Sequence, residues 1–168
     1  APLPERDVLD ARAVFAALPQ RECAWTGRPI PRFDVDHIIP FSLWRNNDLW
    51  NLVPASPAVN EKKSDRLVSR DSLVRSRDLI VHCWETLRGR SPARFDTEVR
   101  RALLRRGSLE AGGWQSAAFA GLVESVELLG HAGRIAWAHG ADGLTITLPR
   151  EKPCEYAVAF KITGENLR

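Results

Sequence analysis

The sequence predicts an α+β fold in which two short strands precede a capped helix, and further helices and a short β-containing tail follow. Three observations support this class. Residues 30–39 alternate apolar and polar side chains at the period of a strand. Ser56-Pro57 is a typical helix start, because serine caps the first amides and proline fits the first helical position. Apolar residues recur at helical spacing in several segments after residue 72.

The elements are expected in a simple order along the chain. The expected elements are a helix over residues 5–18, a short strand and turn within 23–30, a strand over 30–39, a loop over 41–55, helices over 57–67, 72–88, 92–106 and 114–129, and strand-like runs at 135–138, 144–148 and 156–162. Pro40 ends the second strand, and the Asn-rich, aperiodic sequence after it favours a loop.

Composition limits the classes of protein that the chain can be. Of the 168 residues, 44% are apolar and 27% are charged, which is typical of a globular domain and argues against disorder, collagen and coiled coil. No run of about 18 apolar residues and no signal peptide is present, so we expect a cytoplasmic protein with no membrane segment. The sequence has no methionine, and we therefore expect a domain of a larger polypeptide.

Positive charge is concentrated in the middle of the chain. Residues 66–106 contain eleven arginines and five acidic residues, whereas residues 1–65 contain eight basic and nine acidic residues. An arginine-rich block suits phosphate and is a plausible nucleic-acid footprint. The alternative is a set of solvated helix faces whose arginines pair with acidic neighbours. The sequence leaves both interpretations open.

The residues that can carry chemistry lie in three short motifs. The motifs are Asp34-Val-Asp-His-Ile-Ile-Pro40, Asn51-Leu-Val-Pro and Asn60-Glu-Lys-Lys-Ser-Asp65. Oxygen donors from Asp36 and Asn60 suit a hard cation such as Mg²⁺. His37 can accept a proton from water near neutral pH. A metal and an activated water facing a phosphate are what phosphodiester hydrolysis requires.

Residues 22–68 resemble the ββα-metal core of the HNH endonuclease family. They are similar to the HNH domain of RNA-guided CRISPR nucleases and to HNH restriction enzymes, in the motifs "TGRPI", "VDHIIPFS" and "NEKKSD" and in the spacing between them. The resemblance implies that His37 is the general base and that Asp36 and Asn60 hold Mg²⁺ or Mn²⁺. It also implies that Asn51 bonds backbone groups of the loop that carries His37.

Two features depart from the family's most common pattern. Asn60 stands where the family name has a histidine, which favours Mg²⁺ over Zn²⁺ because an amide oxygen is a harder ligand than imidazole. The paired CxxC motifs that hold a structural zinc in many relatives are absent, with only Cys23 near that place. No structural zinc is therefore expected.

Several side chains have a second interpretation. Lys63 can bind phosphate or stabilise the leaving oxygen, but it can equally lie on a solvated helix face. Asp34 competes with Asp36 as the metal ligand, and a regular strand would point Asp36 and His37 to opposite faces. Trp44 and Trp50 can stack on bases, although core packing is favoured. Weaker nucleic-acid candidates are Lys62, Arg66 and Arg70.

We expect a metal-dependent endonuclease that hydrolyses DNA, with RNA not excluded, inside a larger bacterial defence, restriction or mobile-element protein. One such site cuts one strand, so a homodimer is possible. The expected regions are a nuclease core with its N-terminal helix over residues 1–68, an arginine-rich helical region over 69–130 and a β-like tail over 131–168. The alternatives are a degenerate nucleic-acid-binding module, a protein-interaction module and a secreted toxin.

Overall fold

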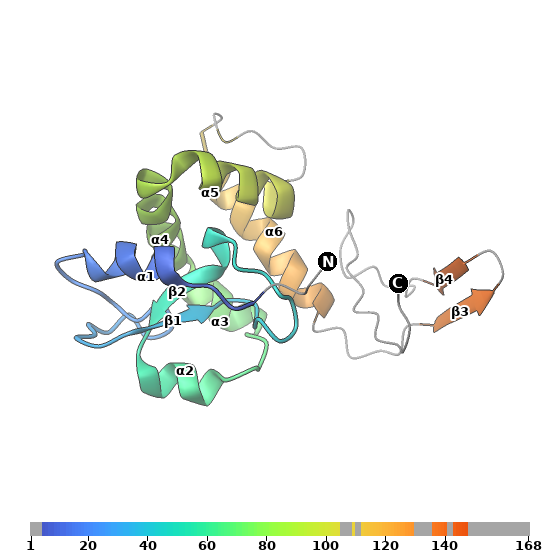
Figure 1. The fold of residues 1–168 in the computed structure, drawn as a ribbon, viewed down its shortest axis with the longest axis horizontal. Helices are drawn as coiled ribbons and strands as arrows, with labels where there is room; N and C mark the ends of the chain where they lie inside the picture. The colour runs from blue at the N-terminus through green and yellow to red at the C-terminus, as the bar shows by residue number, and fades with distance from the viewer. Residues whose placement is uncertain (1–4, 105–108, 110–111, 130–135, 141–142, 148–168) are drawn as a thin grey trace.

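The computed structural model describes residues 5–104, 109, 112–129, 136–140 and 143–147. Its centre is an antiparallel hairpin of two short strands, β1 (Asp34–His37) and β2 (Leu52–Ala55), in which His37 lies opposite Leu52. Helix α2 (Pro57–Lys63) follows β2 directly and lies on one side of the hairpin. Three helices lie on the other side (Figure 1): α4 (Arg77–Arg90), α5 (Pro92–Val99) and α6 (Trp114–Leu129). The chain therefore contains a ββα unit between an N-terminal helix and a helical region.

The expected positions of the two strands were partly wrong. Residues 23–30 form a turn closed by a single bridge between Glu22 and Pro29, and Gly27 sits in it at a φ of 65°. The partner of β1 is instead β2, which lies inside the segment expected to be a loop. All four β2 residues are buried. A strand buried on both faces has no alternation of polar and apolar residues, so the sequence pattern did not reveal it.

The helix starts were predicted better than the helix ends. Ser56 caps α2 by accepting a hydrogen bond from the Val59 amide at 3.3 Å, as expected. That helix ends at Lys63 rather than near residue 67, and the next residue, Ser64, has a φ of 47°. Helix α1 (Leu9–Ala16) is shorter than the expected helix over 5–18. Residues 5–8 stay outside the helix, where the Asp7 carboxylate accepts from the Leu9 amide.

The helical region contains more breaks than expected. The single helix expected over residues 72–88 is two helices, α3 (Arg70–Arg75) and α4 (Arg77–Arg90), separated at Ser76. The remaining elements are a 3₁₀ turn at Leu49–Asn51, α5 (Pro92–Val99), a π-helical turn at Arg100–Leu104, α6 (Trp114–Leu129) and an antiparallel pair of strands, β3 (Ala136–Gly140) and β4 (Gly143–Thr147). The expected strand at 156–162 lies outside the described residues.

One hydrophobic cluster connects the hairpin to the helices on its far side and contains residues from Ala11 to Val126. Trp50 and Trp84 are both fully buried in it, and the Trp84 indole donates to the Trp50 carbonyl at 2.8 Å. Core packing is therefore confirmed for Trp50, and Trp44 packs against its ring. No helix in the described ranges is long and apolar enough to cross a membrane.

Candidate active site

Three of the five expected site residues, Asp36, His37 and Asn60, line one polar hollow of about 180 Å³, whereas Asn51 and Lys63 are not among its lining residues. Asp36 and His37 come from the end of β1, and Asn60 comes from α2. His37 is the last residue of its strand, and both it and Asp36 line this hollow, although consecutive residues of a regular strand point to opposite faces. The complete lining is Arg6, Asp36, His37, Pro40, Phe41, Asn60, Ser64 and Asp65.

The Asp36 carboxylate is 3% exposed and has two hydrogen-bond partners. One oxygen accepts from the Trp25 indole at 2.7 Å, and the other lies 3.1 Å from the Lys63 ammonium. Burial raises the pKa of Asp36, while the charge of Lys63 and both hydrogen bonds oppose that rise. The Lys63 ammonium also donates to the His37 carbonyl at 2.7 Å, and its side chain is only 9% exposed. The alternative of a solvated Lys63 was therefore wrong.

The His37 imidazole is buried, and its Nε2 lies 3.2 Å from Oδ1 of Asn47. Burial lowers the pKa of His37 to about 4; the nearby positive charges of Arg6 and Lys63 act in the same direction, and the bond to Asn47 opposes it. The imidazole is consequently neutral at pH 7. A neutral ring is the form that can accept a proton from water.

Asn51 joins the two ends of the loop between the strands and is 0% exposed. Its Oδ1 accepts from the Ile39 amide at 2.8 Å, and its Nδ2 donates to the carbonyls of Ile39 and Asn46. These are bonds to the backbone immediately after His37, which is the kind of contact expected for this residue. They hold the chain in place where it leaves β1.

Asn60 is held by Asp34, the residue that is the alternative to Asp36 as a metal ligand. The Nδ2 of Asn60 donates to Asp34 at 3.2 Å, which leaves its carbonyl oxygen with no hydrogen-bond donor among the described residues. No group of three or more His, Cys, Asp or Glu side chains in that part of the chain is placed to hold a metal ion. The candidate ligand set is therefore one carboxylate and one amide rather than a carboxylate cluster.

A basic groove contains Lys63, whose ammonium pairs with Asp36 of the site. It encloses about 280 Å³, and its lining residues are Trp25, Val59, Lys62, Lys63, Arg66, Val68, Ser72 and Arg75. Two of the three weaker nucleic-acid candidates, Lys62 and Arg66, are thus brought together, whereas Arg70 is not among the lining residues. The groove contains four basic side chains and no acidic one, so its charge suits a phosphate backbone.

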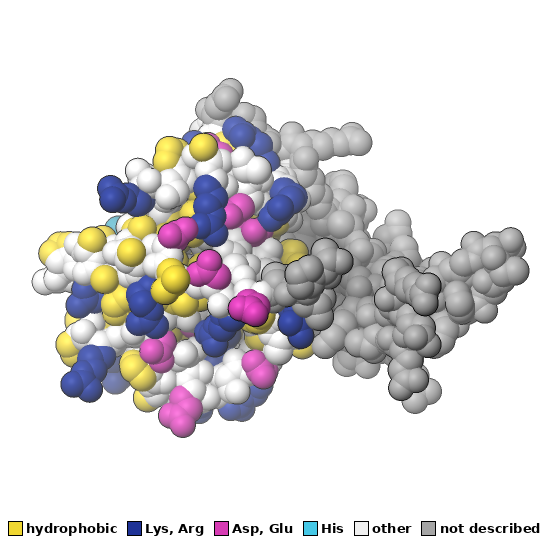
Figure 2. Space-filling model, in the orientation of Figure 1, with side chains coloured by type: hydrophobic (Ala, Val, Ile, Leu, Met, Phe, Trp, Pro, Cys, Tyr) yellow, Lys and Arg dark blue, Asp and Glu magenta, His cyan; other side chains and the backbone are white. Residues whose placement is uncertain are grey.

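Many arginines of the middle segment are paired with acidic residues. The ion pairs are Arg77–Asp78, Arg88–Asp96, Arg94–Glu98 and Arg101–Asp48. On the face shown in Figure 2, basic and acidic side chains are interspersed rather than segregated. The alternative of paired helix faces holds for these four arginines.

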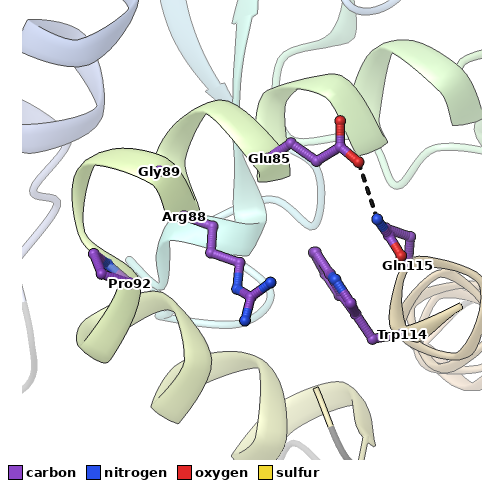
Figure 3. Close-up of a pocket in the computed structure, with 6 residues that line it drawn as sticks. All are labelled: Glu85, Arg88, Gly89, Pro92, Trp114 and Gln115. Atoms are coloured by element: carbon purple, nitrogen blue, oxygen red, sulfur yellow. Dashed lines mark hydrogen bonds between the residues drawn. The ribbon is translucent and has the colours of Figure 1, made fainter. Parts of the chain in front are cut away.

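A larger hollow of about 380 Å³ lies in the helical region between α4, α5 and α6 (Figure 3). Its charged groups already have partners: Glu85 accepts from Gln115 at 2.9 Å, and Arg88 is bound to Asp96 and lies over the Trp114 ring. The close-up shows Glu85 and Gln115 facing each other and the Arg88 side chain beside the Trp114 ring. This arrangement joins helices and offers little for catalysis.

The sequence did not reveal three residues of the site. Trp25 lies in the expected short strand and turn within 23–30, Asn47 in the expected loop over 41–55, and Arg6 in the expected helix over 5–18. Each lies at least ten residues from its partner in the site, and in the sequence nothing distinguishes Asn47 from its neighbour Asn46. These three residues reach the site only through contacts between segments that are distant in the sequence.

Comparison with known proteins agrees with this geometry. Residues 23–69 match the family model described as HNH endonuclease. The matched range contains the turn, both strands of the hairpin and α2. No curated protein matches the chain significantly.

Proposed function

We propose, on the match of residues 23–69 to the HNH endonuclease family model, that the chain is a metal-dependent endonuclease that cleaves phosphodiester bonds of DNA. The observation that carries the proposal is the shared hollow of Asp36, His37 and Asn60. It combines a neutral base with two oxygen donors at one place. The chain would act as part of a larger bacterial defence, restriction or mobile-element protein.

The residues at the site fit a hard divalent cation. Asp36 already accommodates a positive charge, because the Lys63 ammonium lies 3.1 Å from its carboxylate in a buried setting. The second oxygen donor is the carbonyl of Asn60, which lines the same hollow. Carboxylate and amide oxygens are the ligands that Mg²⁺ and Mn²⁺ prefer. When bound, the ion would supply a Lewis acid for the phosphate and the departing oxygen.

The protein's own groups have separable roles in this proposal. The neutral imidazole of His37 takes a proton from the water that attacks phosphorus, and the P–O3′ bond breaks on the opposite side. Asn51 holds the backbone after His37, so the ring keeps its position. Lys63 offsets the charge of Asp36 when no cation is bound, and Lys62 and Arg66 in the basic groove hold flanking phosphates.

Plasmid nicking tests the proposal directly. Supercoiled plasmid, Mg²⁺ and the purified chain should give nicked circles, and His37→Ala should lower the rate by about 10²- to 10⁴-fold, the usual contribution of a general base. His82→Ala is the matched control, because His82 is an exposed histidine on α4 outside this hollow. Equal rates for parent and His37→Ala would refute the assignment of the base.

The main alternative is a catalytically degenerate nucleic-acid-binding module, and the same samples distinguish it. That alternative predicts DNA binding with a steep salt dependence and no Mg²⁺-dependent nicking by the parent protein. The endonuclease predicts that nicking disappears with EDTA and returns with Mg²⁺ or Mn²⁺.

A further inference from the structure

We infer that Asn47 is a positioning residue, which fixes neutral His37 as the tautomer with its proton on Nε2. Nδ1 is then the nitrogen that accepts the proton from water. The inference rests on the proposed function for its catalytic meaning, but the tautomer itself is a property of the folded protein. Neither Asn47 nor the backbone groups of Glu5 and Asp7 that hold its amide belong to the motifs that predicted the site.

The orientation of the Asn47 amide is fixed by two backbone groups. Its Oδ1 lies 3.1 Å from the Asp7 amide nitrogen, and its Nδ2 lies 2.7 Å from the Glu5 carbonyl oxygen. A backbone N–H only donates and a backbone carbonyl only accepts. Exchanging the amide oxygen and nitrogen of Asn47 would therefore break both bonds, so the network assigns one orientation.

This orientation decides which nitrogen of His37 carries the proton. The atom of Asn47 that faces Nε2, at 3.2 Å, is the oxygen Oδ1, which can only accept. Nε2 must therefore be the donor, and in a neutral ring Nδ1 holds the lone pair. No hydrogen bond to Nδ1 occurs among the described residues, so this nitrogen is available to a water or a substrate group.

Two segments outside residues 23–69 hold Asn47 in place. Residues 5–7 supply both partners of its amide, and Arg94 of α5 donates to its backbone carbonyl at 3.4 Å. The residues before α1 are therefore part of the support of the site rather than the first turn of a helix. A donor or acceptor that orients a working histidine through its second nitrogen is a recurring device in enzymes.

Nitrogen NMR tests the tautomer without reference to activity. In the metal-free, ¹⁵N-labelled chain at about pH 8, where an imidazole is neutral, long-range ¹H–¹⁵N correlations separate protonated from unprotonated ring nitrogens. His37→Gln assigns the signals. We expect Nε2–H in the parent and in Asn47→Asp, which keeps an acceptor, and a mixture of both tautomers in Asn47→Ala. Nδ1–H in the parent would overturn the inference, even if Asn47→Ala does not fold.

Nicking kinetics test the consequence for catalysis. Asn47→Ala should lower kcat about 10- to 100-fold, the usual effect of losing such a supporting partner, with little change in KM for DNA, and Asn47→Asp should recover most of the loss. Asn46→Ala is the matched control, because Asn46 is an asparagine of the same loop whose side chain bonds Asp48 instead of His37.

The kinetic outcomes distinguish the positioning role of Asn47 from the proposed nuclease activity. Equal losses in Asn46→Ala and Asn47→Ala would mean that the loop, not the tautomer, matters, and would overturn the inference. Unchanged nicking by Asn47→Ala would overturn it as well. If the parent binds DNA and does not cleave it, the proposed function fails, while the NMR result still decides the tautomer.

Discussion

Replacing Glu98 with alanine should weaken the fold through one hydrogen bond between the helical region and the nuclease core. Glu98 lies on α5 and is buried, and its Oε2 accepts from the Leu49 amide at 2.6 Å. Leu49 begins the 3₁₀ turn that ends at Asn51, the residue that holds the backbone after His37. Glu98 thus supports the candidate site from outside residues 23–69.

The expected magnitude follows from the partners of the two carboxylate oxygens. A hydrogen bond from a buried amide to a charged group contributes about 2 to 3 kcal/mol, because the orphaned amide of Leu49 cannot find water. The other oxygen pairs with Arg94, which is half-exposed, so this ion pair adds only a few tenths of a kcal/mol. Glu98→Ala should therefore lower the free energy of unfolding by about 2 to 3 kcal/mol, or Tm by roughly 5 to 10 °C.

Glu98→Gln is the control that isolates this bond. The glutamine keeps an acceptor for the Leu49 amide and loses only the charge, so its loss should stay below about 1 kcal/mol. Urea denaturation followed by circular dichroism measures both variants. Equal losses in the two variants would refute the hydrogen-bond argument, as would a Glu98→Ala protein as stable as the parent.

Three further predictions concern the site itself. Lys63→Met should destabilise the metal-free protein by about 2 to 4 kcal/mol, because it leaves the Asp36 charge buried without its cation. Mg²⁺ should raise the Tm of Lys63→Met more than the Tm of the parent or of the exposed control Lys62→Met. Equal Mg²⁺-induced shifts in Tm would contradict this prediction. Asn51→Ala should lower the free energy of unfolding by about 2 to 4 kcal/mol, because it leaves both backbone groups of Ile39 without their hydrogen-bond partner. Nicking activity should fall with it. An unchanged free energy of unfolding in urea would contradict this prediction. Because the pKa of His37 is lowered to about 4, nicking at saturating Mg²⁺ should change little between about pH 6 and 8, whereas a base with the ordinary pKa would lose about three quarters of its active form by pH 6.

The sequence predicted the parts of the site that local chemistry determines. The Ser56 cap, the start of α5 at Ser91-Pro92 and the strand that carries Asp36 each depend on residues that are neighbours along the chain. Such signals are strong because they act within a single turn or strand. The match of residues 23–69 confirms the resemblance that these motifs indicated.

The rest depends on contacts between distant segments, which periodicity does not report. Strand β2 is four buried residues and was assigned to a loop, since its pattern lacks alternation. Glu98 and Asn47 were missed because their partners lie 49, 40 and 42 residues away. The roles of the site residues stay predictions, and the proposed regions at 1–68, 69–130 and 131–168 stay predictions as well.

The central claim is that Asp36 and Asn60 hold a divalent cation beside His37. Crystals soaked in Mn²⁺ test it, because anomalous scattering locates the ion without reference to activity. We expect a peak within about 2.5 Å of a carboxylate oxygen of Asp36 and of the Asn60 carbonyl oxygen, with the Lys63 ammonium displaced from Asp36. A peak elsewhere, or no peak while Lys63 remains on Asp36, would contradict the account.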